Sequence, residues 1–159
     1  MRHRQLIAAA IVLTFAACDR VGNNGSGPLS KGDYVDQANE ICAESRTAAS
    51  QIPPPSLADP IAVEQAVAQT IAIQRGSLRE LRDLEAPSRD RPGVRQWLRQ
   101  VDRAIDEMDA LREGLLTGDR AAIAEASSDG ASFTDAAEEF ADAYGLDDCS
   151  TSERDEEED

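Results

Sequence analysis

Four stretches of this chain repeat apolar residues at intervals of three and four, with proline or glycine between the stretches. That spacing places the apolar side chains on one face of a helix. No segment shows the period-two alternation of a half-buried strand. The sequence therefore predicts an all-α fold with essentially no sheet.

The first two predicted helices have clear ends. Asp33 is a plausible N-cap of the first helix, and Pro53 to Pro55 force it to stop. Asp59 followed by Pro60 is a typical start for the second helix, which ends at Ala86 and Pro87. The two apolar faces are Tyr34, Ala38, Ile41, Cys42, Ser45, Ala49 and Ile52, and then Val67, Ile71, Gln74, Leu78, Leu81 and Leu84.

The third and fourth predicted helices follow each other closely. The third opens near Asp90 to Pro92 and ends at Gly118, and Asp119 caps the fourth, which ends at Gly145. An unbroken apolar phase through Gly130 favours one helix over two short ones. The two faces are Val94, Trp97, Leu98, Val101, Ile105, Met108, Leu111 and Leu115, and then Ile123, Ala126, Gly130, Phe133, Ala137, Phe140 and Tyr144.

Four helices of about 20 residues with short connections pack most simply as an up-down-up-down four-helix bundle. We expect this bundle to occupy residues 31–149. Residues 18–30 have the small, polar composition of a flexible tether, and residues 150–159 are an acidic segment that we expect to be a solvated tail.

The N-terminal 17 residues have the composition of an export signal. Arg2 and Arg4 precede an apolar run from Leu6 to Phe15, and small residues then lead to Cys18. A transmembrane helix needs about 20 apolar residues, so this run is too short to span a bilayer. We expect residues 1–17 to be removed during export.

The stretch from Leu13 to Cys18 resembles a bacterial lipobox, in which the cysteine becomes the lipidated first residue of the mature protein. Phe15 departs from the pattern, which usually has an aliphatic residue at that position. The resemblance implies a lipid on Cys18 and a location on the outer face of the cell membrane. The alternative is an ordinary signal peptide cut after Ala16 or Ala17.

Three cysteines in an exported protein leave one unpaired unless it has another role. If Cys18 carries a lipid, Cys42 and Cys149 remain as a natural disulfide pair. In an up-down-up-down bundle the fourth helix ends beside the start of the first, so a C-terminal segment that folds back could bring Cys149 to Cys42. Two buried free thiols are the alternative.

Residues near both of these cysteines resemble a group of small exported helical proteins of actinobacteria, many of them lipoproteins. The similar segments are Tyr34 to Glu44, with a Tyr-to-Cys stretch early in the first helix, and Tyr144 to Cys149, a Gly-x-x-x-Cys ending. The resemblance implies location and fold. It implies no activity, because members of that group generally lack an assigned one.

Acidic residues strongly outnumber basic ones, and the formal net charge is −15. Removal of residues 1–17 would leave 14 basic residues against 31 acidic ones. Nucleic acid and anionic lipid headgroups would be repelled by this charge. We therefore expect no nucleic-acid partner.

Catalytic chemistry has little support in this sequence. The only histidine, His3, lies in the predicted signal, which excludes His-dependent triads and imidazole metal sites from the mature chain. Cysteines in a disulfide cannot act as nucleophiles. Most carboxylates fall on polar helix faces. We expect neither enzymatic activity nor a cofactor or metal site.

Three functional hypotheses remain. The leading one is a non-enzymatic envelope module that docks a protein partner or acts as a spacer, tethered to the membrane by its lipid. The second is a small-ligand-binding bundle, with polar Gln74 and Ser45 and the stacking groups Trp97 and Tyr34 lining the site, although Trp97 is also consistent with a core anchor whose indole edge is near solvent. The third is a hydrolase that depends on two carboxylates.

Overall fold

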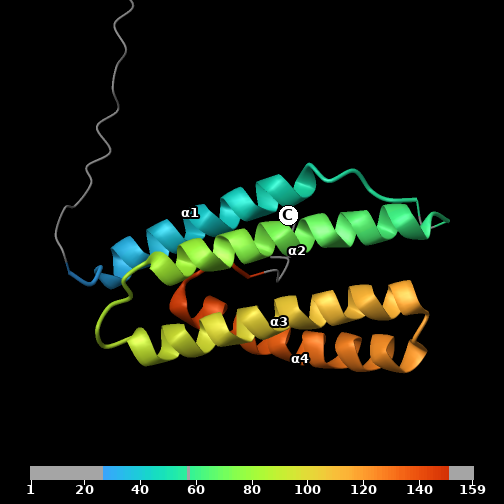
Figure 1. Cartoon of the computed structure of the whole chain (residues 1–159). Coiled ribbons are helices and arrows are strands. Elements are labelled where there is room, and N and C mark those ends of the chain that lie inside the picture. Colours follow the sequence, from blue (N-terminus) through green and yellow to red (C-terminus); the bar gives the residue numbers. More distant parts are fainter. Residues whose placement is uncertain (1–26, 57, 151–159) are drawn as a thin grey trace, which may run out of the picture.

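The computed structural model describes residues 27–56 and 58–150 and contains four helices in these ranges, with no strand. Helix α1 is Lys31–Ser50, α2 is Pro60–Asp83, α3 is Arg91–Thr117 and α4 is Arg120–Tyr144. Successive helices run in opposite directions (Figure 1). The predicted all-α fold of four helices is confirmed, and the alternating helix directions agree with the predicted up-down-up-down arrangement.

Several predictions concern parts of the chain that lie outside the described residues. These are the export signal at 1–17, the lipidation site Cys18, the tether up to residue 26 and the acidic segment 151–159. The predicted start of the tail at Ser150 is wrong, because Ser150 is only 5 % exposed. The folded part of the chain thus extends one residue beyond Cys149.

The ends of the helices follow local capping chemistry. Asp59 and Asp119 accept hydrogen bonds from the first backbone amides of α2 and α4, as predicted. The predicted cap Asp33 is wrong: the side chain of Ser30 accepts from the backbone N–H of Asp33, so α1 begins three residues earlier. Gly118 and Gly145 end α3 and α4 in the left-handed region, with φ of 69° and 93°.

Helix α4 is continuous through Gly130, as its apolar phase predicted. Small residues let α3 and α4 approach closely, and this is the most extensive helix pair in the bundle. A Cβ on Gly114 would lie 2.9 Å from Cγ1 of Ile123 and 3.2 Å from its backbone nitrogen. A Cβ on Gly76 in α2 would meet nothing closer than 4.0 Å.

These two glycines give opposite expectations for the same substitution. Gly76→Ala should stabilise the protein by about 0.5–1 kcal/mol, because alanine is the better helix former and has room. Gly114→Ala should destabilise it by about 1–2 kcal/mol, because the overpacking cost exceeds the gain in helix propensity. Urea unfolding of both variants measures the difference. Equal effects would contradict the close approach of α3 and α4 at Gly114.

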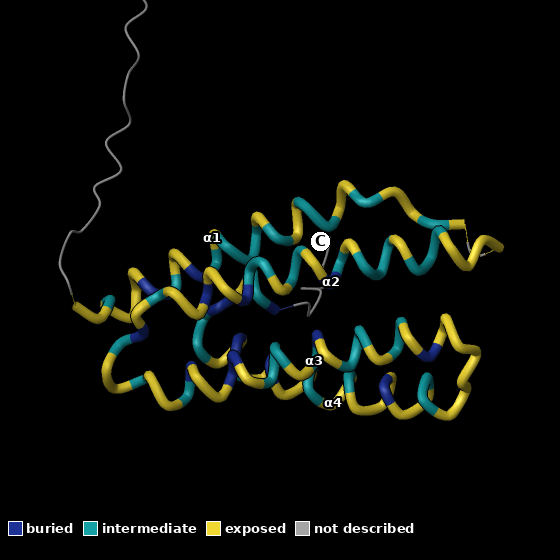
Figure 2. Tube along the Cα trace, in the orientation of Figure 1, coloured by how far each residue is buried: buried dark blue, intermediate teal, exposed yellow. Residues whose placement is uncertain are grey.

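The core is concentrated at the end of the bundle where α1 begins. Most buried positions come from the start of α1 and α3 and from the end of α2 and α4 (Figure 2). They include Tyr34, Ala38, Leu78, Leu81, Val94, Trp97, Leu98, Ala137 and Ala141. Fewer positions are buried towards the opposite end, among them Gly114 and Ala126. Leu115, expected on the buried face, is 47 % exposed there, because it lies in the last turn of α3, near the end of the bundle.

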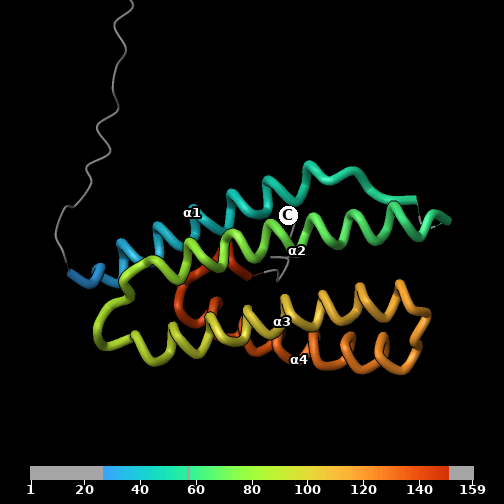
Figure 3. The backbone as a smooth tube through the Cα atoms, viewed as in Figure 1, coloured from blue at the N-terminus to red at the C-terminus, as the bar shows by residue number. Residues whose placement is uncertain are grey.

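The chain after α4 completes the bundle. It leaves α4 and crosses towards α1 (Figure 3). Leu146 in this segment is fully buried, although it lies outside every helix. Helices α1 and α2 pack on each other, α2 packs on α3, and α3 packs on α4. The C-terminal segment therefore supplies part of the closure between the first and last helices.

Candidate functional site

A disulfide joins Cys42 in α1 to Cys149 in the C-terminal segment, across a sequence separation of 107 and with Cα atoms 5.1 Å apart. The predicted pairing is confirmed. Asn39 supports it with two hydrogen bonds: its amide donates to the carbonyl of Gly145 over 3.2 Å, and its side-chain oxygen accepts from the backbone N–H of Asp148 over 3.0 Å. Arg46 adds an ion pair with Asp148. We call residues 145–150 with these contacts the C-terminal clasp.

Four aromatic rings form a column that links α3, α4 and α1. The rings of Trp97 and Phe140 stack at 6.0 Å, those of Phe140 and Tyr144 stack at 5.2 Å, and Tyr34 meets Tyr144 edge-on at 6.2 Å. The ammonium group of Lys31 lies 4.3 Å from the centre of the Tyr144 ring. Sequence reasoning missed this column, although Phe140 and Tyr144, four residues apart on a helix, were a signal for it.

The two tyrosines differ in how their hydroxyl groups are satisfied. Tyr144 donates a hydrogen bond of 2.8 Å to the carboxylate of Asp90. The hydroxyl of Tyr34 is buried and has no hydrogen-bond partner among the described residues. Burial raises the pKa of Tyr34 to about 12. Burial, and then the Asp90 carboxylate, raise the pKa of Tyr144 as well.

Removing each hydroxyl should therefore have a different effect. Tyr34→Phe should leave stability unchanged or raise it by about 1 kcal/mol, because no hydrogen bond is lost, whereas Tyr144→Phe should lower it by about 1–2 kcal/mol. The fold favours the neutral form of both tyrosines, so the stability that depends on this form is fully present below the ordinary tyrosine pKa. It is lost as the pH rises through the raised pKa of the folded state. Between about pH 10 and pH 12, Tyr34→Phe should lose less stability than the parent protein. Urea unfolding across this range is the measurement, and identical pH dependence in the two proteins would contradict the assignment.

A cavity of about 340 Å³ lies between the helices and the C-terminal clasp. All four helices contribute to its walls. Its apolar lining residues include Leu78, Leu81, Trp97, Val101, Ala104, Met108 and Ala137. Its polar and charged ones include Ser45, Gln74, Ser77, Thr134, Ser150, Arg46, Glu138 and Asp148. Because Arg46 and Asp148 are about half exposed, their ion pair marks the mouth of the cavity.

The structure brings together most, but not all, of the residues proposed from the sequence as ligand-lining. Gln74, Trp97 and Ser45 line the same cavity. Tyr34 does not: it is fully buried against Tyr144, because the first turns of α1 pack against the end of α4. Trp97 is 2 % exposed, and its indole N–H has no acceptor among the described residues. The expectation that its edge lies near solvent is wrong.

Several lining residues were not predicted from the sequence, among them Arg46 and Glu138. Ser77 and Thr134 are each next in sequence to a residue of a predicted apolar face. A single polar residue in a helix is no signal for a binding site, so neither was proposed. Asp148 and Ser150 enter the lining only because the chain folds back after Gly145. That return depends on contacts far apart in the sequence, such as those of Asn39.

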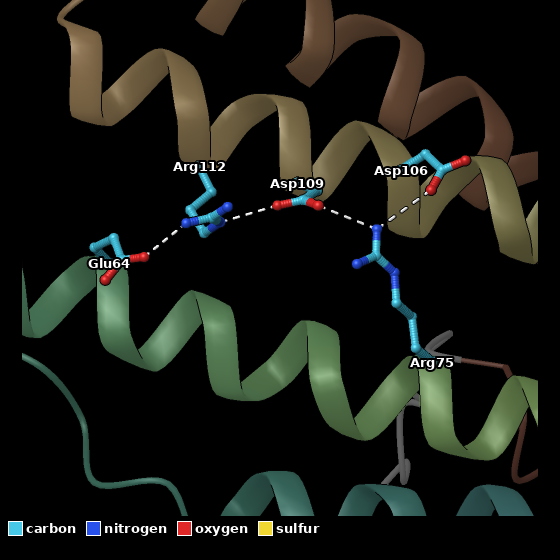
Figure 4. A network of polar contacts seen from close by, with 5 residues as sticks. All are labelled: Glu64, Arg75, Asp106, Asp109 and Arg112. Carbon is cyan, nitrogen blue, oxygen red and sulfur yellow. Dashed lines mark hydrogen bonds and ion pairs between the residues drawn. The ribbon is translucent and has the colours of Figure 1, made fainter.

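A network of ion pairs joins α2 to α3 on another part of the surface (Figure 4). Arg112 pairs with Glu64 at 2.7 Å and with Asp109 at 2.9 Å, and Arg75 reaches Asp109 at 3.1 Å and Asp106 at 3.4 Å. Hydrogen bonding from Arg112 lowers the pKa of Asp109 and is the largest cause of the shift. These groups are partly exposed, so the network fixes the register of two helices more than it adds stability.

The cavity and the shifted ionisable groups do not coincide. Tyr34, Tyr144, Asp109 and Arg112 are the described groups with shifted pKa values, and none of them lines the cavity. Shifted pKa values in a cleft are the usual physical sign of acid–base catalysis. The cavity thus offers a partly open, mainly apolar space with hydrogen-bonding groups in its lining.

In 27–56 and 58–150, no three or more His, Cys, Asp or Glu side chains gather as a metal ion would require. Within the same ranges, none of the four helices has the length and apolar character needed to cross a bilayer.

Comparison with known proteins gave no relative. No family model matches the chain, and neither the curated proteins nor the solved structures contain a significant match.

Proposed function

We propose that this chain is a non-enzymatic lipoprotein domain, anchored through Cys18 to the outer face of a bacterial cell membrane, where it docks a protein partner. The main supporting observation is the disulfide between Cys42 and Cys149, because it leaves Cys18 as the one cysteine of the chain without a disulfide partner. A long-range disulfide suits an oxidising compartment outside the cytoplasm. The lipobox-like residues before Cys18 then supply a role for the third thiol.

The surface of the bundle supports docking over a purely passive spacer. Ile61, Leu115 and Leu116 are the large apolar side chains most exposed in the described chain, at 68 %, 47 % and 60 %. They lie at the start of α2 and the end of α3, which share one end of the bundle (Figure 1). Because α1 begins at the other end, a tether preceding α1 would hold these side chains away from the membrane.

One experiment in intact cells tests both parts of the proposal. The full chain carries a photo-crosslinking amino acid at Leu116, and a matched control carries it at Glu80, an exposed residue towards the other end of α2. We expect one defined protein adduct from position 116 in the membrane fraction and none from position 80. The added change Cys18→Ser should move the protein from the membrane fraction to the aqueous fraction.

The two parts fail independently. Equal, diffuse crosslinking from both positions would reject docking at this end of the bundle. Retention of the Cys18→Ser protein in the membrane fraction would reject the lipid anchor.

A second candidate function is the binding of a small ligand, which the cavity between the helices favours. Its volume of about 340 Å³ lies at the lower end of the range of about 300–1,000 Å³ that is usual for ligand sites. Gln74, Ser45 and Trp97, the polar and stacking groups expected to line such a site, are among its walls.

A further inference from the structure

The cavity has the features of a site for one class of ligand, and this inference rests on the second candidate function. We propose that it binds a neutral, mainly apolar small molecule that carries a hydrogen-bond-accepting oxygen. The size of the cavity, the apolar walls, the hydrogen-bonding side chains of the lining and the local charge each contribute to this assignment.

The walls select an apolar body. Leu78 and Leu81 from α2 face the cavity together with Val101 and Met108 from α3. Apolar atoms make up most of the surface that these walls expose to the cavity. An apolar ligand would remove that surface from water, which is the main source of affinity in sites of this kind.

The lining also offers hydrogen-bonding side chains for one oxygen of the ligand. The side-chain amide of Gln74 lines the cavity and can donate to an accepting oxygen, and Ser77 lines the same wall on α2. The indole N–H of Trp97 is buried within the wall, where a molecule in the cavity does not reach it.

The charges at the cavity disfavour an anion. Glu138 and Asp148 line it, and Arg46, the one cationic residue among the described lining residues, already pairs with Asp148. The formal net charge of −15 on the whole chain acts in the same direction. A carboxylate or sulfonate would therefore bind more weakly than a neutral molecule of the same shape.

Trp97 also makes the site measurable, because it is the only tryptophan of the chain. Its fluorescence can be transferred to a dye that enters the cavity. A suitable probe is 6-propionyl-2-(dimethylamino)naphthalene, which is neutral and has a ketone oxygen. The anionic comparison probe is 8-anilinonaphthalene-1-sulfonate. Titration of the full chain with the neutral probe should give saturable energy transfer with one probe per chain.

Filling the cavity should abolish this signal. Ala104→Phe places a ring in the cavity from α3 and should weaken binding of the neutral probe about tenfold or more. Ala110→Phe makes the same change on an exposed position of α3 outside the lining and is the matched control, which should bind as the parent does. Ser77→Leu fills the cavity from α2 and provides a second occluding variant if Ala104→Phe folds poorly.

The acceptor is tested by removing the donor. Gln74→Leu keeps a side chain of similar size but has no N–H, and binding is again followed through energy transfer from Trp97. The variant should weaken binding of the ketone probe about five- to tenfold relative to N-phenyl-1-naphthylamine, a neutral probe without an oxygen. An equal loss for both probes would overturn the hydrogen bond from Gln74.

The remaining outcomes separate the proposals. Sulfonate binding as tight as that of the neutral probe, and equally blocked by Ala104→Phe, would overturn the neutral class and leave ligand binding standing. No saturable transfer from either probe, or equal transfer in the Ala104→Phe, Ser77→Leu and Ala110→Phe variants, would overturn the cavity as a ligand site and the second candidate function with it.

Discussion

Reducing the disulfide between Cys42 and Cys149 should lower the free energy of unfolding by about 4–5 kcal/mol. The bond closes a loop with a sequence separation of 107, and its loss lets the unfolded chain sample many more conformations. Typical domains have a total stability of only about 5–15 kcal/mol, so the reduced protein should be partly unfolded near body temperature. Urea unfolding with and without a phosphine reductant, followed by Trp97 fluorescence and circular dichroism, measures the change.

The control for this experiment is the double variant Cys42→Ala/Cys149→Ala. It should start at the lower stability and show no response to the reductant. A loss below about 1 kcal/mol in the parent protein would mean that the clasp holds without its covalent bond. The contacts of Asn39 and Arg46 would then carry the closure of the bundle.

Leu146→Ala should destabilise the protein by about 2–5 kcal/mol, the usual range for a leucine removed from a core. Leu146 is fully buried although it belongs to no helix, so its side chain is the apolar anchor of the C-terminal clasp. Leu116→Ala is the matched control, because that side chain is 60 % exposed, and it should change stability by no more than about 0.5 kcal/mol.

Leu146 and the disulfide should also act as one unit. Adding Leu146→Ala to the reduced protein should cost less than in the oxidised protein, because the clasp is already loosened and the two effects are not additive. Thermal unfolding of the four combinations gives the coupling. Fully additive effects would show that the bond and the side chain hold different parts of the fold.

Local chemistry accounts for the parts of the fold that could be predicted from the sequence. Asp59 and Asp119 cap their helices because a carboxylate followed by free backbone amides is a strong local signal. Gly118 and Gly145 adopt the left-handed conformation for which glycine is the favoured residue. The apolar phase through Gly130 likewise predicted a continuous α4.

Errors appeared where two local signals competed or where position along the bundle mattered. The sequence prediction took Asp33 as the cap of α1, but Ser30 is also a good capping residue and is the one that caps the helix. Leu115 continues the apolar stripe of α3, but it lies beyond the concentrated core, where no partner covers it. Periodicity identifies the face of a residue and does not show how far the neighbouring helices extend.

The candidate site was only partly predictable for the same reason. Gln74 could be proposed because it is a polar residue on an apolar helix face, and Trp97 because it is a large aromatic residue on such a face. Both line the cavity. Tyr34 is likewise an aromatic residue on an apolar face, but it packs into the aromatic column because Tyr144, at the end of α4, lies against it. The contribution of Asp148 depends on a chain reversal that no local motif specifies.

We propose a chain that is anchored through Cys18 and whose bundle is closed by the disulfide between Cys42 and Cys149. Peptide mapping by mass spectrometry of the protein purified from its own cells, without reduction, tests this directly. We expect the mature chain to begin at Cys18 with attached lipid, and the Cys42 and Cys149 peptides to be recovered as one disulfide-linked species. A chain whose Cys18 is unmodified and disulfide-bonded to Cys42 or Cys149 would contradict the account.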